Sequence, residues 1–169
     1  TGTRGETKKL IKQLGITTVM VTHEIRDAAM LADAVTVIDQ GKNVQTGSYS
    51  DLYHKPNSKK VAGAVGFTNW MEGKVSGDKF ACALGSFDVE RDLLKTPTPI
   101  LGARPESFKI NESGKYVGQV KGATFYEGQY EYTLQVEGQE LRFRSLENAG
   151  VSMGDDLRFD MINYFFVPS

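Results

Sequence analysis

His23 is the residue in the first part of the chain with the clearest capacity for chemistry, because it directly follows an apolar run. It stands in "TTVMVTHEIRD", between an expected strand and an expected helix. In open α/β sheets the groups that contact ligands gather beyond the carboxyl ends of the strands, where this imidazole would lie. One ring nitrogen of a neutral imidazole donates a hydrogen bond and the other accepts one. His23 could therefore contact a bound ligand, or it could merely satisfy backbone groups at a strand-to-helix junction.

Other residues with chemical potential point to structural roles. Asp39 in "VTVIDQG" follows a second apolar run, but Gln40 and Gly41 behind it predict a tight hairpin turn. Cys82 alternates with its neighbours in "FACAL" and is predicted to face a core, and His54 in "LYHKP" is predicted to be a solvated helix-end residue. One cysteine and two histidines are too few for a zinc-type cluster, so no metal ligands are predicted.

The elements around His23 follow from alternating helix and strand patterns. Apolar spacing predicts a helix over 6–14 that ends at Gly15, and the β-branched run 17–22 predicts a buried strand. A helix over 24–33 and a strand over 34–39 come next, followed by a tight turn and a short third strand. The order strand, helix, strand indicates the edge of an α/β layered domain.

The pattern changes after Gly66. A short helix opened by Ser48 or Ser50 and a second one over 58–65 precede the change. Beyond it, short alternating runs are separated by glycine-containing turns, most clearly over 130–136. Such runs predict an all-β barrel or sandwich, for which two linked OB-like units are one arrangement. The expected fold is therefore an α/β part over 1–66 followed by an all-β, OB-like part over 67–169.

Composition and charge agree with two modules in an ordinary globular protein. The chain has 169 residues, of which 40% are hydrophobic, and a net charge of -1. Residues 1–66 carry a net charge of +3 and residues 67–169 one of -4. No apolar run approaches the roughly 20 residues that cross a bilayer, and a single cysteine suits a reducing compartment. Because the sequence opens on Thr1 without a methionine, we expect an excised piece or a processed product.

Aromatic residues of the β region raise a nucleic-acid alternative, because they could stack on bases at an OB-like surface. The region is acidic and lacks a basic stripe, which disfavours contact with phosphates. Core packing is the favoured role, and no nucleic-acid partner is expected. The aromatic residues for which core packing is favoured are Trp70, Phe80, Tyr126, Tyr130, Tyr132, Phe143, Phe165 and Phe166.

Five stretches, in order and at sensible spacing, resemble the ATP-binding subunits of ABC importers, in the branch that carries a C-terminal TOBE domain. They are "LGITTVMVTHE", "AAMLADAVTVIDQGKNVQTGS", "DLYHKP", "VGFTN" and "LGARPE". The match is dense over 14–69 and sparse afterwards. The resemblance implies that 1–66 is the C-terminal part of a nucleotide-binding domain and 67–169 a TOBE regulatory domain. Asn69, Arg104 and Glu106 match family positions, and we expect them to be structural, the last two tying a loop to the barrel.

The resemblance also implies a role for His23, that of the switch histidine that contacts the γ-phosphate of ATP and helps to position the attacking water. ATP hydrolysis depends mainly on such positioning and on charge stabilisation. The rest of the site is missing: no G-x-x-x-x-G-K-[ST] loop and no LSGGQ-type signature occur, and "EGQYE" is no substitute. The family's metal-binding aspartate precedes the switch histidine, so Asp39 is not its equivalent. No cofactor-binding residue is therefore predicted in this chain.

These implications define the expected function. The complete parent subunit would use ATP and Mg²⁺ to drive solute import, whereas this chain alone should bind no cofactor and hydrolyse nothing. Its expected partners are a second copy and transmembrane permease subunits on the cytoplasmic face of the membrane, with a small regulatory ligand as a further candidate. The alternative is a free-standing TOBE module that senses an oxyanion or a metal. Because the strands 17–22 and 34–39 would leave apolar surface uncovered, we also expect self-association or partial disorder there.

Overall fold

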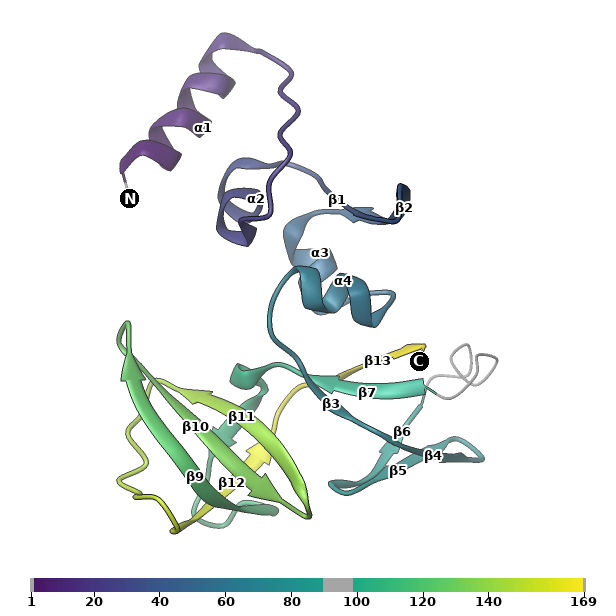
Figure 1. Cartoon of the computed structure of the whole chain (residues 1–169), viewed down its shortest axis with the longest axis vertical. Helices are drawn as coiled ribbons and strands as arrows, with labels where there is room; N and C mark the ends of the chain where they lie inside the picture. The colour runs from purple at the N-terminus through teal and green to yellow at the C-terminus, as the bar shows by residue number, and fades with distance from the viewer. Residues whose placement is uncertain (1, 90–98, 169) are drawn as a thin grey trace. The chain divides into compact units, whose positions relative to one another are not determined.

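The computed structural model describes residues 2–89 and 99–168, and contacts between Cα atoms divide the chain into two compact units (Figure 1). The first unit is Thr1–Gly66 and the second is Phe67–Ser169. Helices and one small hairpin make up the first unit, whereas strands dominate the second. The chain is therefore a mixed α/β protein with a β-rich half-barrel.

Short helices surround one hairpin in the first unit. Helix α1 spans Gly2–Leu14, and the chain then turns at Gly15, whose φ is +63°. Helix α2 spans Ile25–Leu31. Strands β1 (Val35–Asp39) and β2 (Lys42–Gly47) pair antiparallel, and helices α3 (Tyr49–His54) and α4 (Lys59–Ala64) follow them. Each helix and both strands of the hairpin lie where the sequence predicts them, within a few residues.

Positive φ angles at two neighbouring residues close the hairpin between β1 and β2. Gln40 has a φ of 47° and Gly41 one of 75°. Two central residues with positive φ match the right-handed twist of the paired strands. The prediction of a tight turn directly after Asp39 is thus confirmed.

The predicted strand over 17–22 does not form. Its residues adopt no regular structure, and the side chains of Val19 and Val21 are 90% and 97% exposed. In the part of this unit that the structure describes, β1 pairs with β2 alone, so no strand lies beside 17–22. Because a strand is stabilised by its neighbours, a β-branched run without one gains no hydrogen-bond ladder. The strand prediction is therefore wrong for this chain.

A small core holds the hairpin against α3 and α4. Its buried members are Val37, Leu52, Val61 and Val65. Ser48 begins α3 with a capping box: the Asp51 N–H donates to the Ser48 hydroxyl at 3.1 Å, and the Ser48 N–H donates to the Asp51 carboxylate at 3.2 Å. Ser48, rather than Ser50, is therefore the residue that opens this helix.

Three antiparallel sheets form the described part of the second unit. One has the order β11-β10-β9-β12-β8, another β13-β7-β3, and the third β4-β5-β6. Two-residue turns with positive φ join β9 to β10 and β10 to β11. The strands are β3 (Asn69–Met71), β4 (Gly73–Ser76), β5 (Lys79–Cys82), β6 (Gly85–Asp88), β7 (Pro99–Ala103), β8 (Phe108–Ile110), β9 (Tyr116–Tyr126), β10 (Gln129–Val136), β11 (Gln139–Ser145), β12 (Asp156–Met161) and β13 (Phe165–Pro168).

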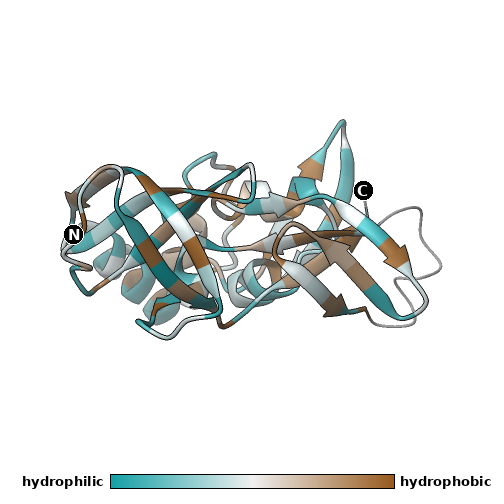
Figure 2. Cartoon of the chain, turned by 90° about the horizontal axis from the view of Figure 1, so that it is seen from below, coloured by the Kyte–Doolittle hydropathy of each residue, from teal (hydrophilic) through white to brown (hydrophobic). Residues whose placement is uncertain are grey.

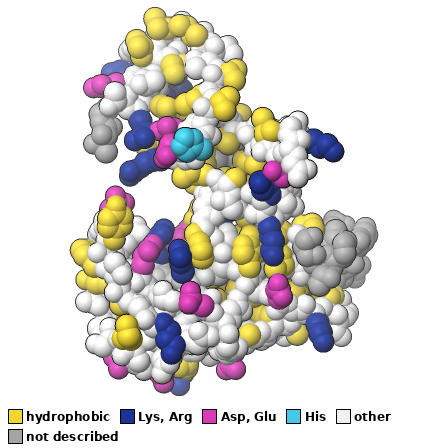
Figure 3. Space-filling view, in the orientation of Figure 1, with side chains coloured by type: hydrophobic (Ala, Val, Ile, Leu, Met, Phe, Trp, Pro, Cys, Tyr) yellow, Lys and Arg dark blue, Asp and Glu magenta, His cyan; other side chains and the backbone are white. Residues whose placement is uncertain are grey.

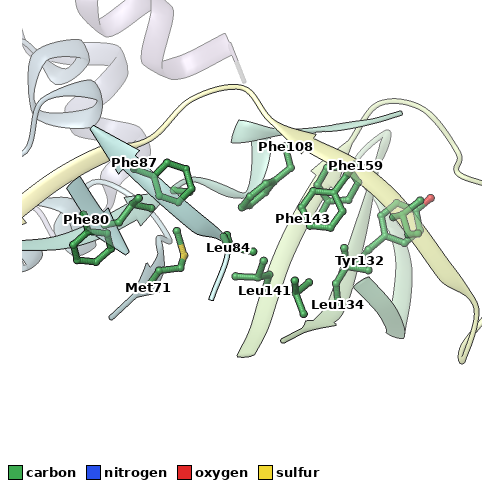
Figure 4. Close-up of a cluster of buried hydrophobic side chains, with 14 of the residues drawn as sticks. Met71, Phe80, Leu84, Phe87, Phe108, Tyr132, Leu134, Leu141, Phe143 and Phe159 are labelled. Atoms are coloured by element: carbon green, nitrogen blue, oxygen red, sulfur yellow. The ribbon is translucent and has the colours of Figure 1, made fainter. Parts of the chain in front are cut away.

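Alternation along the strands builds the core of the second unit. In β10, Tyr132, Leu134 and Val136 are buried while Glu131 is exposed, which confirms the predicted half-buried strand. Figure 2 shows the same alternation of hydrophobic and hydrophilic residues along the strands. The buried side chains gather in one cluster (Figure 4). Its aromatic centre is Phe108, Phe143 and Phe159, whose ring centroids lie 5.5 to 6.0 Å apart.

Candidate functional site

The backbone turn before α2 places His23 on the surface. The Thr22 hydroxyl accepts a hydrogen bond from the Glu24 N–H at 2.9 Å. The Glu24 carbonyl accepts from the N–H groups of Asp27 and Ala28, which begins the helix. The imidazole between them is 96% exposed. His23 therefore lies immediately before a helix, as predicted, but after an irregular segment instead of a strand.

One acidic neighbour defines the electrostatics of the imidazole. His23 Nε2 lies 3.6 Å from Glu24 Oε1, a contact that is an ion pair only when the ring is protonated. No further hydrogen bond or ion pair reaches His23 from the residues that the structure describes. Both ring nitrogens are thus accessible to an incoming group, and the ring can donate to or accept from it.

The described residues do not complete a catalytic site around His23. They hold no group of three or more His, Cys, Asp or Glu side chains that could bind a metal ion. A shallow hollow on α1 is lined by Lys8, Lys9 and Lys12 and does not include His23. The 96% exposure of the His23 side chain shows that the described residues do not enclose this imidazole.

The three residues assigned structural roles from local pattern behave as predicted. Asp39 ends β1 and forms an ion pair with Lys60 at 3.0 Å. His54 is exposed at the end of α3, where its Nδ1 lies 2.9 Å from the Ser50 carbonyl oxygen. Cys82 is half-buried against the core, and this burial raises the pKa of its thiol.

Asn69 is buried at the start of β3 and links two distant strands. Its side-chain amide donates to the Arg142 carbonyl at 2.8 Å and to the Ala103 carbonyl at 3.2 Å. Its side-chain oxygen accepts from the Arg142 N–H at 2.7 Å. Asn69 is therefore structural, as predicted, although nothing in the sequence identifies partners so far along the chain.

Arg104 is also buried and ties the start of the second unit to the loop after β7. Its guanidinium donates to the Phe67 carbonyl at 3.2 Å and to the Thr68 hydroxyl at 2.7 Å. The guanidinium also lies over the Phe165 ring, 5.4 Å from its centroid. The prediction that Arg104 holds a loop in place is confirmed by these contacts.

Glu106 contributes a longer and more exposed contact. Its carboxylate lies 3.9 Å from Arg144, which also pairs with Glu131 at 2.6 Å. An exposed pair of this kind adds little to stability. Arg144 was not singled out in the sequence, although it stands directly opposite Glu131 in the β10–β11 register.

The aromatic residues divide between core and surface. Phe80, Tyr132 and Phe143 are fully buried, which confirms core packing for these three. Tyr126 is 67% exposed near the turn between β9 and β10, so core packing is wrong for this residue. It lies at the end of a long strand, where the sheet no longer has a core beneath it.

Across the described ranges 2–89 and 99–168, the structure contains no helix with the length and apolar character of a membrane span.

Comparison with known proteins gives several relatives, although no family model matches the chain. The spermidine/putrescine import ATP-binding protein PotA of Clostridium acetobutylicum is 29% identical over 167 residues, which is 93% of this chain and 45% of the relative. The sulfate/thiosulfate import ATP-binding protein CysA 2 of Chromobacterium violaceum is 38% identical and covers 61% of this chain and 28% of the relative.

A third relative is named for sugars. The xylose/arabinose import ATP-binding protein XacK of Haloferax volcanii is 38% identical over 117 residues, or 64% of this chain and 30% of the relative. The chain spans less than half the length of each of these relatives. All three are import ATP-binding proteins, in agreement with the resemblance of the motifs around His23. The chain is therefore a homologue of the ATP-binding subunits of ABC importers and matches part of the length of such a subunit.

Proposed function

We propose that this chain forms the C-terminal portion of the ATP-hydrolysing subunit of an ABC-type solute importer, with His23 as its switch histidine. The observation that carries the proposal is the 96% exposed imidazole in front of α2, in a chain whose relatives are import ATP-binding proteins. An imidazole that its own chain leaves accessible is able to meet a phosphate supplied by the rest of a nucleotide site.

In the proposed role, His23 forms a hydrogen bond with the transferred phosphoryl group. A ring N–H can donate to a γ-phosphate oxygen, and the same contact helps to orient the attacking water. The turn made by Thr22 and Glu24 fixes the backbone on the helix side of the imidazole. The complete subunit would use ATP and Mg²⁺, but the described residues form no metal-binding cluster, so no step through the metal ion is assigned to this chain.

The two units carry different parts of the proposed function. Residues 1–66 would complete the nucleotide-binding domain, and residues 67–169 would be a TOBE-type, OB-like regulatory or dimerisation domain. The antiparallel β-rich architecture of the second unit supports this assignment. The proposed partners are a second copy of the subunit and transmembrane permease subunits, with a small regulatory ligand as a further candidate, at the cytoplasmic face of the membrane.

The similarity does not favour a free-standing sensor. The match to the Clostridium acetobutylicum relative covers 93% of this chain, so it extends over both units and not over the β unit alone. The relatives are named for polyamines, sulfate and sugars, and what they share is the ATP-binding role in import. The proposal therefore covers import of a solute without assigning one.

The proposal is tested by measuring ATP turnover of this 169-residue chain and of the full product of its gene under the same conditions. We expect turnover by a longer product that carries the phosphate loop and none by residues 1–169, because no phosphate loop occurs in this sequence. Turnover by residues 1–169 that disappears in His23→Ala would contradict the proposed division of the site.

A further inference from the structure

The last part of β9 is a free strand edge in the second unit, which folds around its own core. Strand β12 pairs with β9 only over Tyr116–Gln119. The Val120 N–H then donates to the Asp155 carbonyl, and the Val120 carbonyl accepts from the Gly154 N–H, each at 2.8 Å. Beyond this point, residues 121–126 pair with β10 alone among the strands that the structure describes. Such an edge offers backbone donors and acceptors to another strand.

The backbone groups of Ala123 and Phe125 point away from β10. Tyr126 and Gln129 flank the two-residue turn Glu127–Gly128, so they form a hydrogen-bonded pair of the β9–β10 ladder. In an antiparallel ladder, hydrogen-bonded pairs alternate with pairs whose N–H and C=O groups face the other way. The amides of Ala123 and Phe125 are therefore directed at the position that a further strand beside β9 would occupy.

The side chains of this edge combine exposed aromatic rings with small residues. Phe125 is 63% exposed and Tyr126 is 67% exposed. Figure 3 shows hydrophobic side chains on the surface at this end of the second unit. Ala123 is exposed, and the nearest described atoms to a Cβ at Gly122 would be those of Thr133, at 3.9 Å. The edge therefore has open space beside its two small residues and two large rings without cover.

One basic and one acidic side chain stand at the two ends of the edge. Lys121 and Glu127 are both exposed, and neither forms an ion pair with another residue that the structure describes. Lys121 donates a hydrogen bond to the uncharged side chain of Gln119. The segment "KGATFYE" thus reads basic, small, small, threonine, aromatic, aromatic, acidic. Its first half complements its second half in both size and charge.

We propose that residues 121–127 of two copies of this chain pair as antiparallel strands about a two-fold axis at Thr124. A two-fold axis perpendicular to a sheet makes one residue face its own counterpart, and residues that face each other share one side of the sheet. The register pairs each basic or small residue with an acidic or aromatic residue of the other copy: Lys121 with Glu127, Gly122 with Tyr126, and Ala123 with Phe125.

This pairing uses every feature of the edge. Ala123 of each copy exchanges backbone hydrogen bonds with Phe125 of the other, and the two Thr124 side chains form a favourable cross-strand pair. Aromatic rings that lie across from glycine in a neighbouring strand cover its exposed backbone, which is the relation of Tyr126 to Gly122. The proposal rests on the proposed function in one respect, because it names the surface for the second copy that is a partner there.

Charge selects this register over its neighbours. With the axis at Ala123, Lys121 would face Phe125 and Glu127 would lie beyond the paired residues. With the axis at Thr124, both charges of each copy are paired, so the contact has two opposite-charge pairs by symmetry. Each such cross-strand pair is favourable, whereas like charges directly opposite each other are destabilising.

Sedimentation velocity over a range of concentrations tests the association. All chains carry Val21→Lys, so that the exposed apolar run 17–22 adds no second contact. We expect this chain to shift from monomer to dimer as its concentration rises. Lys121→Glu and Glu127→Lys each place like charges opposite each other at both ends of the pair, so each should weaken the dimer roughly tenfold or more. An equal mixture of these two variants restores opposite charges at both ends and should dimerise like the parent chain.

Glu137→Lys is the matched control for the charge reversals. Glu137 is exposed and holds the first position of the other two-residue turn in the same sheet, with a φ of 46° against 49° for Glu127. This variant should dimerise like the parent chain. Equal loss of dimer in Glu137→Lys would overturn the proposal, and so would a mixture of the two reversed variants that dimerises no better than either alone.

Cysteine cross-linking in a Cys82→Ser background tests the register. Thr124→Cys should form a disulfide-linked dimer, since directly opposed Cα atoms lie about 4.5–5.5 Å apart. Glu131→Cys should not, because Glu131 lies one strand further in, opposite Thr124 of its own copy, and its symmetry mate would be about 14 Å away. Equally rapid cross-linking of Glu131→Cys would contradict the register.

Monomer at every concentration would also overturn the proposal and would leave this edge to a strand of another protein. None of these measurements involves nucleotide or His23. Failure of the strand pair and failure of the proposed ATP-hydrolysing role are therefore separate results.

Discussion

At the scale of single residues, Asn69 is the clearest test of what holds the second unit together. Asn69→Ala removes three hydrogen bonds and leaves the Arg142 peptide group and the Ala103 carbonyl without their side-chain partner. Each buried polar group left unsatisfied costs about 1–3 kcal/mol, so we expect the free energy of unfolding to fall by about 3 kcal/mol. Urea unfolding measures this change.

Asn148→Ala is the matched control, because Asn148 is exposed and, among the described residues, its side chain accepts a hydrogen bond only from the Gly150 N–H. Its effect should stay below about 1 kcal/mol. Equal effects of the two substitutions would mean that the buried contacts of Asn69 add nothing to stability.

Asp160 predicts a dependence of stability on pH. Hydrogen bonds from the Lys115 N–H and the Asn111 side-chain amide lower the pKa of its carboxyl group. Because the pKa in the folded state lies below that in the unfolded state, the resulting stability is present above the ordinary Asp pKa of about 3.9. It is lost as the pH falls from there through the folded pKa.

Asp160→Asn should remove this contribution. Chemical unfolding at neutral pH and at a series of lower pH values measures this contribution. The difference in unfolding free energy between the unmodified chain and the variant should shrink as the pH falls. A difference that grows as the pH falls would have the wrong sign for a lowered pKa.

Single-residue roles were predictable where the signal is local. Asp39, His54 and Cys82 follow from their immediate neighbours, and the structure places them as predicted. The exposure of Tyr126 was not predictable, because it depends on where a long strand extends beyond the core. The hydrogen-bond partners of Asn69 were not predictable either, because they lie on strands distant in sequence.

At the scale of elements, the start of α3 depends on its capping box. Ser48→Ala removes the side-chain acceptor for the Asp51 N–H, and loss of such a cap costs about 1 kcal/mol. Thermal unfolding should therefore show a lower midpoint for this variant. Ser50→Ala, one turn from His54 in the same short helix, lacks the capping role and serves as the control. A larger loss in Ser50→Ala would show that the cap is not what begins the helix.

Two glycines predict opposite effects of the same substitution. A Cβ on Gly73 would lie 2.3 Å from the carbonyl oxygen of Ala81 in the paired strand, so the backbone itself would have to move. Gly73→Ala should lower the free energy of unfolding by about 3 kcal/mol or more. Gly63 lies in α4 with open space around it, and Gly63→Ala should raise helix stability by about 0.5–1 kcal/mol. Denaturant unfolding of both variants measures these changes in stability. A Gly73→Ala protein as stable as the unmodified chain would contradict the close approach of the Ala81 carbonyl to Gly73.

Element predictions succeeded where the stabilising partner is adjacent in sequence. The β1–β2 hairpin needs only Gln40 and Gly41 to close it, and each helix from α1 to α4 carries its own apolar stripe or cap. The run over 17–22 has equally strong β-propensity, yet it stays irregular because no neighbouring strand lies beside it among the described residues. Propensity identifies a strand, but only a partner stabilises one.

At the scale of the whole molecule, the two units differ in architecture, in net charge and in the strength of their motifs. The first unit has a net charge of +3 and holds the dense motif run around His23, whereas the acidic second unit folds around its own aromatic core. The proposed function assigns nucleotide chemistry to the first unit and regulation to the second. On this basis a change at His23 should affect turnover without affecting the stability of the β unit.

ATP turnover by the complete subunit carrying His23→Ala tests the central claim most directly, with His54→Ala as the control at the second exposed histidine. Loss of one hydrogen-bond donor at the transferred phosphate should lower turnover on the order of 100-fold while nucleotide binding is retained. His54→Ala should leave turnover unchanged. Full turnover in His23→Ala would contradict the proposal that this imidazole acts at the γ-phosphate.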